Sequence, residues 1–125
     1  MKQFLLLFSL VGLFSFTTPT GFDEIVGALK EGNANKMAQQ FDNTIEITMP
    51  TKSDSYGKVQ AEMILKDFFS SNTVKGFTVI HKGENNGSQY CIGNLTTRNG
   101  TFRTTIYIKQ KADKQLIQEI SFEAA

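Results

Sequence analysis

Three stretches in the first half of the chain carry apolar residues at intervals of three and four. This spacing aligns the apolar side chains along one face of a helix. The three sets are Phe22, Ile25, Val26 and Leu29; Ala34, Met37, Ala38 and Phe41; and Ala61, Ile64, Leu65 and Phe68. Gly32 is suited to end the first helix, and Asn33 to cap the second. The pattern therefore predicts three helices, over residues 20–32, 33–41 and 57–72.

Much of the remaining chain alternates between apolar and polar residues, as half-buried strands do. The alternating segments are residues 43–49, 77–82, 89–97, 101–109 and 115–123. Asn86-Gly87 and Asn99-Gly100 separate three of them, and Asn-Gly favours a hairpin because both turn residues need a positive φ. Residues 50–57 are polar and predict a loop. The predicted order is α-α-β-α-β-β-β-β, ending in a four-stranded antiparallel meander.

These elements predict an α+β domain with three N-terminal helices packed on one face of a curved, mostly antiparallel sheet. A two-residue turn at Asn99-Gly100 would place Thr97 opposite Phe102. The face expected to meet the helices then carries Ile80, Cys91, Gly93, Leu95, Phe102, Thr104, Ile106 and Ile108. The opposite face carries Phe77, Val79, His81, Tyr90, Ile92, Asn94, Arg103, Thr105 and Tyr107. In the last strand, either the set Leu116, Gln118, Ile120 and Phe122 or the set Ile117, Glu119 and Ser121 faces the core.

The first 20 residues differ from the rest of the chain. Lys2 precedes the 13-residue apolar run FLLLFSLVGLFSF, and small residues follow it. This arrangement is typical of a secretory signal peptide, whereas a membrane span needs about 20 apolar residues. We therefore expect residues 1–20 to be removed and residues 21–125 to form a single domain. The protein is then expected to be secreted, into the periplasm of a Gram-negative bacterium, with no membrane attachment after cleavage.

Charge and composition exclude several classes of function. The chain has 13 Lys and Arg against 12 Asp and Glu, which leaves no basic excess to attract nucleic acid. One Cys and one His exclude a disulfide framework and a His-rich metal site, so we expect neither a metal nor a cofactor. Cys91 has no partner for an intrachain disulfide. It is either a buried apolar residue or an exposed thiol able to join two chains.

Five short segments carry a resemblance to a known family. They are ALKEGNA (28–34), QAEMILKDFF (60–69), FTVIHKG (77–83), YCIG (90–93) and GTFR (100–103). Over residues 22–123 the chain resembles secreted bacterial proteins of the family called domain of unknown function 4783. The order of elements is also similar to the nuclear transport factor 2-like superfamily, a cystatin-like α+β cone of curved sheet around helices. That superfamily includes isomerases, dehydratases and cyclases as well as binding and dimerisation modules, so the resemblance implies a fold and no particular reaction.

The candidate site residues lie on the predicted strands. An isomerase or dehydratase in such a cone needs a carboxylate or His base and a hydrogen-bond donor for the developing oxyanion. These groups are present as His81, Tyr90, Arg103, Tyr107 and Glu119. Their spacing matches no catalytic motif, so the sequence favours a non-catalytic role for them in ligand binding.

Three hypotheses about function follow from these features. The favoured one is a non-catalytic module that binds a small apolar ligand or a protein partner. The second is a small isomerase or dehydratase-type lyase that uses a His or carboxylate of perturbed pKa in a pocket. The third is a structural homodimer in which the mixed face of the sheet packs against a second copy of the chain.

Overall fold

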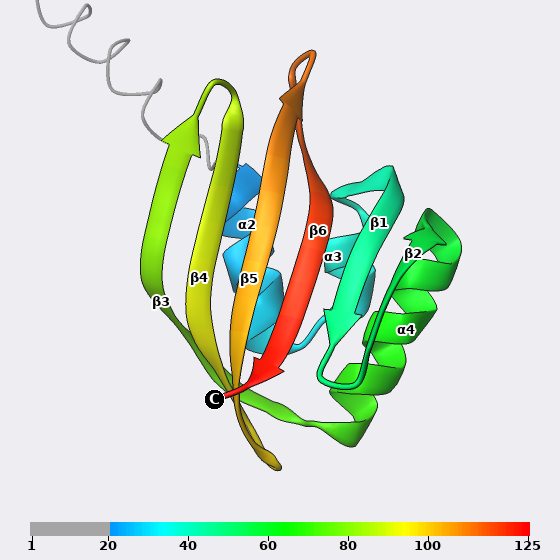
Figure 1. Cartoon of the computed structure of the whole chain (residues 1–125), viewed down its shortest axis with the longest axis vertical. Helices are drawn as coiled ribbons and strands as arrows, with labels where there is room; N and C mark the ends of the chain where they lie inside the picture. Colours follow the sequence, from blue (N-terminus) through cyan, green and yellow to red (C-terminus); the bar gives the residue numbers. More distant parts are fainter. Residues whose placement is uncertain (1–20) are drawn as a thin grey trace, which may run out of the picture.

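The computed structural model describes residues 21–125, so the predicted signal peptide lies outside the described residues. Its elements are α2 (Gly21–Glu31), α3 (Ala34–Ala38), β1 (Phe41–Met49), β2 (Lys52–Gly57), α4 (Lys58–Ser71), β3 (Val74–Asn85), β4 (Ser88–Thr97), β5 (Gly100–Lys111) and β6 (Lys114–Ala124) (Figure 1). None of the helices in this part of the chain is long and apolar enough to cross a bilayer.

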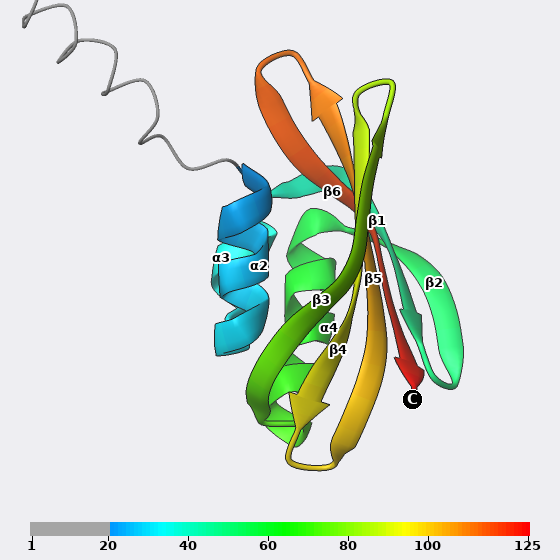
Figure 2. The ribbon, with the colours of Figure 1, turned by 90° about the vertical axis from the view of Figure 1, so that its left-hand side faces the viewer.

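The strands form one curved sheet in the order β2-β1-β6-β5-β4-β3. The helices α2, α3 and α4 lie together on one side of it (Figure 2). Strands β3 to β6 are antiparallel neighbours, as predicted, and β1 joins β6 in parallel. The predicted α+β class is therefore confirmed. We call the side that the helices cover the inner face, and the opposite side the outer face.

The segment predicted as a loop between the second and third helices contains the edge strand β2. It pairs with β1 from Thr44 opposite Gly57 to Met49 opposite Lys52. Nearly all its side chains are exposed, so it lacks the apolar alternation by which a sequence reveals a strand. Backbone pairing at the edge of the sheet, with little burial, makes this segment a strand.

The core lies between the helices and the inner face. Its largest fully buried side chains include Ile25, Leu29, Met37, Phe41, Ile45, Leu65, Leu95, Ile106, Ile117 and Phe122. The predicted cap of the second helix is present, because Asn33 Oδ1 accepts a hydrogen bond from the Lys36 N–H at 3.0 Å. The spacing had placed Phe41 at the end of that helix. In the structure Phe41 is instead the first residue of β1.

The hairpin between β4 and β5 turns one residue earlier than predicted. Thr97 pairs with Gly100, so Arg98 and Asn99 form the turn, and Gly100 follows with a φ of 121°. The pairing of β4 with β5 is therefore shifted by two residues from the prediction: Phe102 lies opposite Leu95 and not opposite Thr97. Two residues are one full strand repeat, so the predicted faces of β4 and β5 are unchanged.

A β-bulge around Ile80 exchanges the two faces of β3. Before the bulge, Phe77 pairs with Leu95 and is only 5% exposed. Its predicted place on the outer face was therefore wrong. Ile80, predicted to lie in the core, is 42% exposed. A single extra residue causes both errors, and no feature of an alternating pattern marks where such a residue is inserted.

A second bulge settles the ambiguous last strand. Ile117 pairs with Ile108 and Glu119 with Tyr107, which leaves Gln118 as the extra residue. The strand therefore draws core residues from both predicted sets: Ile117, Ile120 and Phe122 are all buried. Glu119 consequently points to the outer face.

Candidate functional site

The five predicted site residues all lie on the outer face. Tyr90, Tyr107 and Glu119 form one row across β4, β5 and β6, and the two tyrosine ring centroids are 6.2 Å apart. Arg103 lies four residues before Tyr107 on β5. His81 lies on the edge strand β3 and pairs with Ile92, which pairs with Thr105, the residue midway between Arg103 and Tyr107. The structure thus brings residues of four strands to one open surface, outside the space between helices and sheet.

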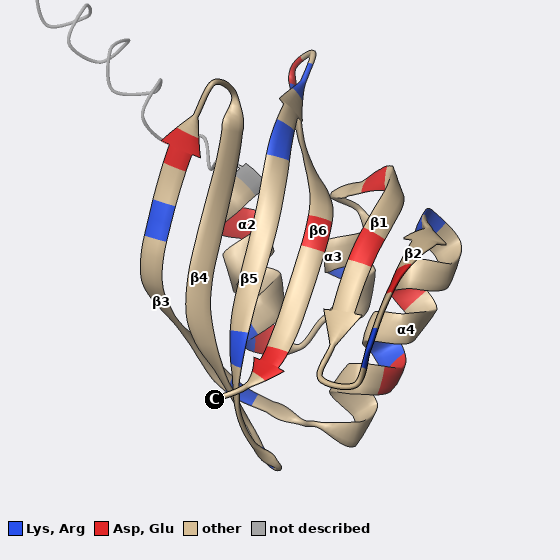
Figure 3. Ribbon diagram, in the orientation of Figure 1, with Lys and Arg blue, Asp and Glu red and all other residues tan. Residues whose placement is uncertain are grey.

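At the β6 end of this row the outer face carries two adjacent carboxylates. Glu119 on β6 pairs with Glu46 on β1, and Figure 3 shows the acidic segments of these strands side by side. Partial burial, together with the charge of Glu46, raises the pKa of the Glu119 carboxyl. In the described part of the chain no cation lies within 4.0 Å of either carboxylate. The sequence did not point to Glu46, because the parallel pairing of β1 with β6 joins distant segments.

Arg103 on β5 is a cation of the outer face. Its Nε donates a hydrogen bond to Asn94 Oδ1 at 3.2 Å. Glu123 is its neighbour on β6. No carboxylate of residues 21–125 lies within 4.0 Å of the guanidinium nitrogens. Arg103 is therefore oriented by an amide and has no ion pair with any residue of the described range.

A row of small side chains separates Arg103 from the two carboxylates. Ser121 pairs with Thr105 on one side and with Thr48 on the other. The Thr48 hydroxyl lies 2.9 Å from the hydroxyl of Ser53. We call Thr105, Ser121, Thr48 and Ser53 the hydroxyl row. On one side of the row lie Arg103 and Glu123, and on the other side lie Glu119 and Glu46.

Tyr90 also has a structural role in the sheet. It pairs with Gly83 on β3, and a Cβ atom at that glycine would overlap the Tyr90 ring. An aromatic ring that packs on a glycine of the neighbouring strand shields the glycine backbone from solvent. The position of the ring on the outer face is therefore fixed by packing.

Aromatic rings fill the space between α4 and the inner face of the sheet. The ring centroid of Phe68 lies 5.8 Å from that of Phe69, 5.2 Å from that of Phe102 and 4.3 Å from that of Phe122. These rings come from α4, β5 and β6 and occupy the space between helix and sheet. Aromatic side chains here are packing residues that close this end of the cone.

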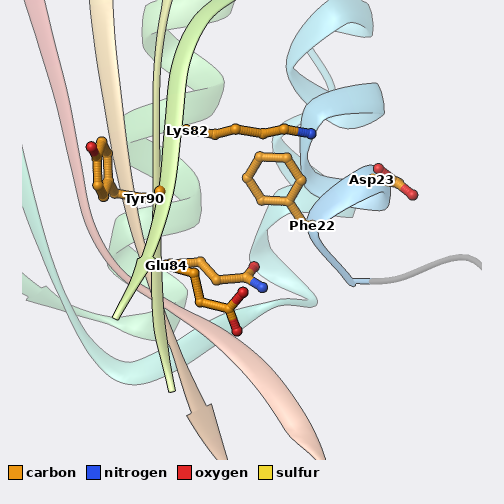
Figure 4. A pocket seen from close by; sticks show the side chains of 7 residues that line it. Phe22, Asp23, Lys82, Glu84 and Tyr90 are labelled. Carbon is orange, nitrogen blue, oxygen red and sulfur yellow. The ribbon is translucent and has the colours of Figure 1, made fainter. Parts of the chain in front are cut away.

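A cavity of about 420 Å³ lies at the other end of the cone, between the start of α2 and the β3–β4 hairpin. It is lined by Phe22, Asp23, Lys82, Gly83, Glu84, Gln89 and Tyr90. Only Tyr90 is also a predicted site residue. Figure 4 shows its ring on the opposite side of the strands from Phe22 and Lys82.

The most strongly perturbed carboxylate was not predicted from the sequence. Asp42 accepts hydrogen bonds from Lys111 Nζ at 2.8 Å, Gln118 Nε2 at 2.9 Å and the Asn43 N–H at 2.7 Å. These bonds, that from Lys111 first, lower the pKa of Asp42 to about 2. The cluster lies where β1 meets β6 and the β5–β6 hairpin. Each polar group of the carboxylate is used, so its role is structural.

The other reactive groups of the described residues offer no further site. Cys91 is a free thiol with no exposed surface, and burial raises its pKa. The prediction of a buried residue is confirmed, and the alternative of an exposed thiol was wrong. Within residues 21–125, no three His, Cys, Asp or Glu side chains are grouped to hold a metal ion.

The curved sheet with helices on its inner face defines a nuclear transport factor 2-like fold, as the sequence resemblance implied. An NTF2-like protein of unknown function from Cytophaga hutchinsonii ATCC 33406 matches 88% of this chain and 95% of its own, with a TM-score of 0.61 and 11% identity. At that identity the likeness concerns the fold alone.

The particular family follows from closer matches. The family model named Domain of unknown function (DUF4783) matches residues 22–123, and the chain belongs to this family. Crystal structures of DUF4783 family proteins from Bacteroides fragilis YCH46 and Bacteroides uniformis ATCC 8492 are 34% and 30% identical to it, with TM-scores of 0.78 and 0.79. Each alignment covers 82% of this chain and 96% or 95% of the other. A search of curated proteins gives no match.

Proposed function

We propose that the protein is a non-catalytic interaction module whose outer face binds a protein partner, and that this partner is a second copy of the chain. The observation that carries the proposal is that Arg103 lies on one side of the hydroxyl row and Glu119, beside Glu46, on the other, with none of the three in an ion pair among the described residues. A catalytic role is not proposed, because His81 and Glu119 lie on an open sheet surface and not in a cavity.

The two carboxylates indicate that the outer face is incomplete in the single chain. Glu119 is half-buried beside Glu46, and its raised pKa reflects an unfavourable environment for the charged form. Like charges on neighbouring strands destabilise a sheet. A cation supplied by a partner would relieve both effects, which is a reason to look for that cation outside the chain.

Two-fold symmetry supplies such a cation from the same surface. Consider an axis that runs across the strands along the hydroxyl row, between two outer faces. It brings Arg103 opposite the partner's Tyr107, one strand from the partner's Glu119, and the reverse contact forms at the same time. A guanidinium can stack on a tyrosine ring and bind a carboxylate with two hydrogen bonds. The same axis brings Glu123, the neighbour of Arg103 on β6, opposite the partner's Glu119, so each Arg103 would lie beside both carboxylates and compensate their charges.

The size and shape of the outer face are consistent with an interface. Six strands spaced by about 4.8 Å, with about ten residues each, give a face of about 700–800 Å², close to the area that one partner buries in a stable complex. The hydroxyl row allows close approach, since Thr and Ser project little from the sheet. Tyr90 and Tyr107 flank it, and tyrosine is enriched at interfaces.

The predicted signal peptide leads us to propose further that this interaction takes place outside the cytoplasm. The support is the apolar run of residues 4–16 after Lys2. The proposed outer-face contact consists of charged, aromatic and hydroxyl groups and needs no disulfide. A buried Cys91 is consistent with folding in an oxidising compartment.

Sedimentation equilibrium of charge-reversal variants tests the dimer. We expect Arg103→Glu and Glu119→Arg each to weaken association by about a hundredfold, because each places like charges against one another, and the double variant to restore most of it. Asp67→Asn, on α4 away from the outer face, is the control and should associate like the unchanged protein.

A second variant separates the interface from the fold. Glu119→Gln should weaken association but should not lower the thermal stability of the dissociated protein, because it removes the repulsion from Glu46. Two results would overturn the proposal. One is a monomer at all concentrations up to about 0.5 mM, where even a Kd of about 1 mM gives detectable dimer. The other is a double charge reversal that fails to restore association.

A further inference from the structure

We propose that the cavity between the start of α2 and the β3–β4 hairpin binds a small zwitterion of the α-amino-acid type with an apolar side chain. The cavity lies on the helix side of β3 and β4, so this inference is independent of the outer face. It rests on four lining groups: the ring of Phe22, the ammonium of Lys82, the carboxylate of Glu84 and the carboxamide of Gln89.

The cavity is a gap between two elements that are far apart in the sequence. Phe22 comes from the first turn of α2, whereas Lys82, Glu84 and Gln89 come from the hairpin (Figure 4). Its volume of about 420 Å³ lies in the range of small-molecule sites, about 300–1,000 Å³. The Phe22 N–H donates a hydrogen bond to Gln115 Oε1 at 3.1 Å, which fixes the start of the helix against β6.

Lys82 brings a cation to the cavity. Its Nζ lies 5.5 Å from the centroid of the Phe22 ring, a cation–π contact. Among the described residues no carboxylate oxygen lies within 4.0 Å of this nitrogen. Lys82 pairs with the buried Cys91 across the strands, so its side chain leaves the sheet on the inner side. The ammonium is thus held over an aromatic ring at the cavity.

Glu84 brings an anion to the same cavity. It follows Lys82 by two residues, so both side chains leave β3 on the same side, about 6.6 Å apart at the backbone. Glu84 has no cation within 4.0 Å in the described part of the chain. A cation and an anion that line one cavity without pairing are complementary to a ligand that carries both charges close together.

Gln89 adds a carboxamide oxygen that accepts no hydrogen bond from the described residues. It pairs with Glu84 across the hairpin, and its Oε1 is screened from solvent without a hydrogen-bond partner in residues 21–125. Such a group is destabilising where it stands. The last torsion of a glutamine is broad, so the carboxamide can turn its oxygen toward the cavity. A ligand ammonium between Glu84 and Gln89 would satisfy both acceptors.

The complementary ligand follows from these positions. Its carboxylate binds Lys82, its ammonium binds Glu84 and Gln89, and its apolar side chain rests on the ring of Phe22. An ordinary α-amino acid meets these three requirements. A singly charged molecule of the same size would leave either Lys82 or Glu84 without a counter-charge from the ligand.

Three probes distinguish a zwitterion site from a simple charge site. L-leucine carries both charges, 4-methylpentanoate lacks the ammonium, and 3-methylbutylamine lacks the carboxylate. Titrated into the protein made from the full 125-residue sequence, L-leucine should shift the backbone NMR signals of Lys82, Glu84 and Gln89. We expect its affinity to exceed that of each analogue by about tenfold or more.

Variants assign the effect to the cavity. Lys82→Met and Glu84→Gln keep the length of the side chain and should each weaken L-leucine binding by about tenfold. Lys75→Met, an exposed lysine earlier on β3, is the matched control and should bind like the unchanged protein. Equal affinity for L-leucine and either analogue, equal binding by all three variants, or no shift at these residues with any probe would overturn the proposal.

Discussion

Asp42→Asn tests the ion pair that ties β1 to the β5–β6 hairpin. The carboxylate accepts a hydrogen bond from Lys111 Nζ at 2.8 Å and another from Gln118 Nε2 at 2.9 Å. These contacts, with the bond from the Asn43 N–H, lower the pKa of Asp42 from 3.8 to about 2. Asparagine keeps the size of the side chain and one carbonyl oxygen, but it removes the charge. The substitution therefore isolates the electrostatic part of the interaction.

The size of the effect follows from the pKa. A depressed pKa in the folded protein stabilises it above the unfolded value of 3.8, and this stabilisation is lost as the pH falls through about 2. The shift corresponds to at most about 2.4 kcal/mol at neutral pH. The side chain of Lys111 is 49% exposed, so solvent screens its part. We therefore expect Asp42→Asn to lower the free energy of unfolding by about 1.5 kcal/mol at pH 7.

Urea unfolding followed by circular dichroism at several pH values measures this difference. The loss caused by Asp42→Asn should fall to about half its neutral value at pH 3 and nearly vanish at pH 2, as the unchanged protein becomes protonated. Asp54→Asn is the control. Like Asp42, Asp54 accepts a hydrogen bond from the N–H of the next residue, here at 2.8 Å, but it has no Lys or Gln donor among the described residues. A loss independent of pH, or an equal loss in the control, would refute the reasoning.

Two other predictions concern the interior. Phe68→Ala removes the ring that stacks on Phe122 at 4.3 Å and should lower the free energy of unfolding by about 3 kcal/mol, whereas Met63→Ala on the exposed side of the same helix should change it by less than about 0.5 kcal/mol. Similar losses in urea unfolding of both variants would contradict the packing role. Cys91 should not react with Ellman's reagent at pH 8 until urea unfolds the protein, because the thiol is buried and its pKa is raised. Stoichiometric reaction of the folded protein within minutes would show that the strand pair around it opens readily.

Local patterns explain why the helices and the meander could be predicted. The helix faces at Ile25 and Leu65 follow a spacing of three and four, and Asn86-Gly87 form the expected turn with φ values of 50° and 81°. What failed has a different physical origin. The strand β2 is stabilised by edge pairing, and the bulges at Ile80 and Gln118 depend on how the sheet bends over the helices. None of these features leaves a periodic signal.

The same distinction applies to the candidate site. Tyr90, Tyr107 and Arg103 could be placed on one face because strand alternation is local and a shift of two residues preserves it. Glu46 could not be placed beside Glu119, since the parallel contact of β1 with β6 joins segments about 70 residues apart. The cavity between α2 and the β3–β4 hairpin was missed for the same reason. It exists only once the start of the helix lies against the hairpin.

Two carboxylates of this chain differ in how the fold treats their charge, and the difference underlies the binding role that we propose for the outer face. Asp42 is surrounded by donors from three residues, and its pKa is lowered. Glu119 has no cation within 4.0 Å among the described residues, lies beside a second carboxylate, and has its pKa raised. Asp42 is buried and Glu119 is partly buried. The described residues compensate the charge of Asp42 but not that of Glu119. The charge of Glu119 lies on the same open face as Arg103, which has no ion pair among the described residues, and this is the ground on which we propose a partner that brings the two charges together.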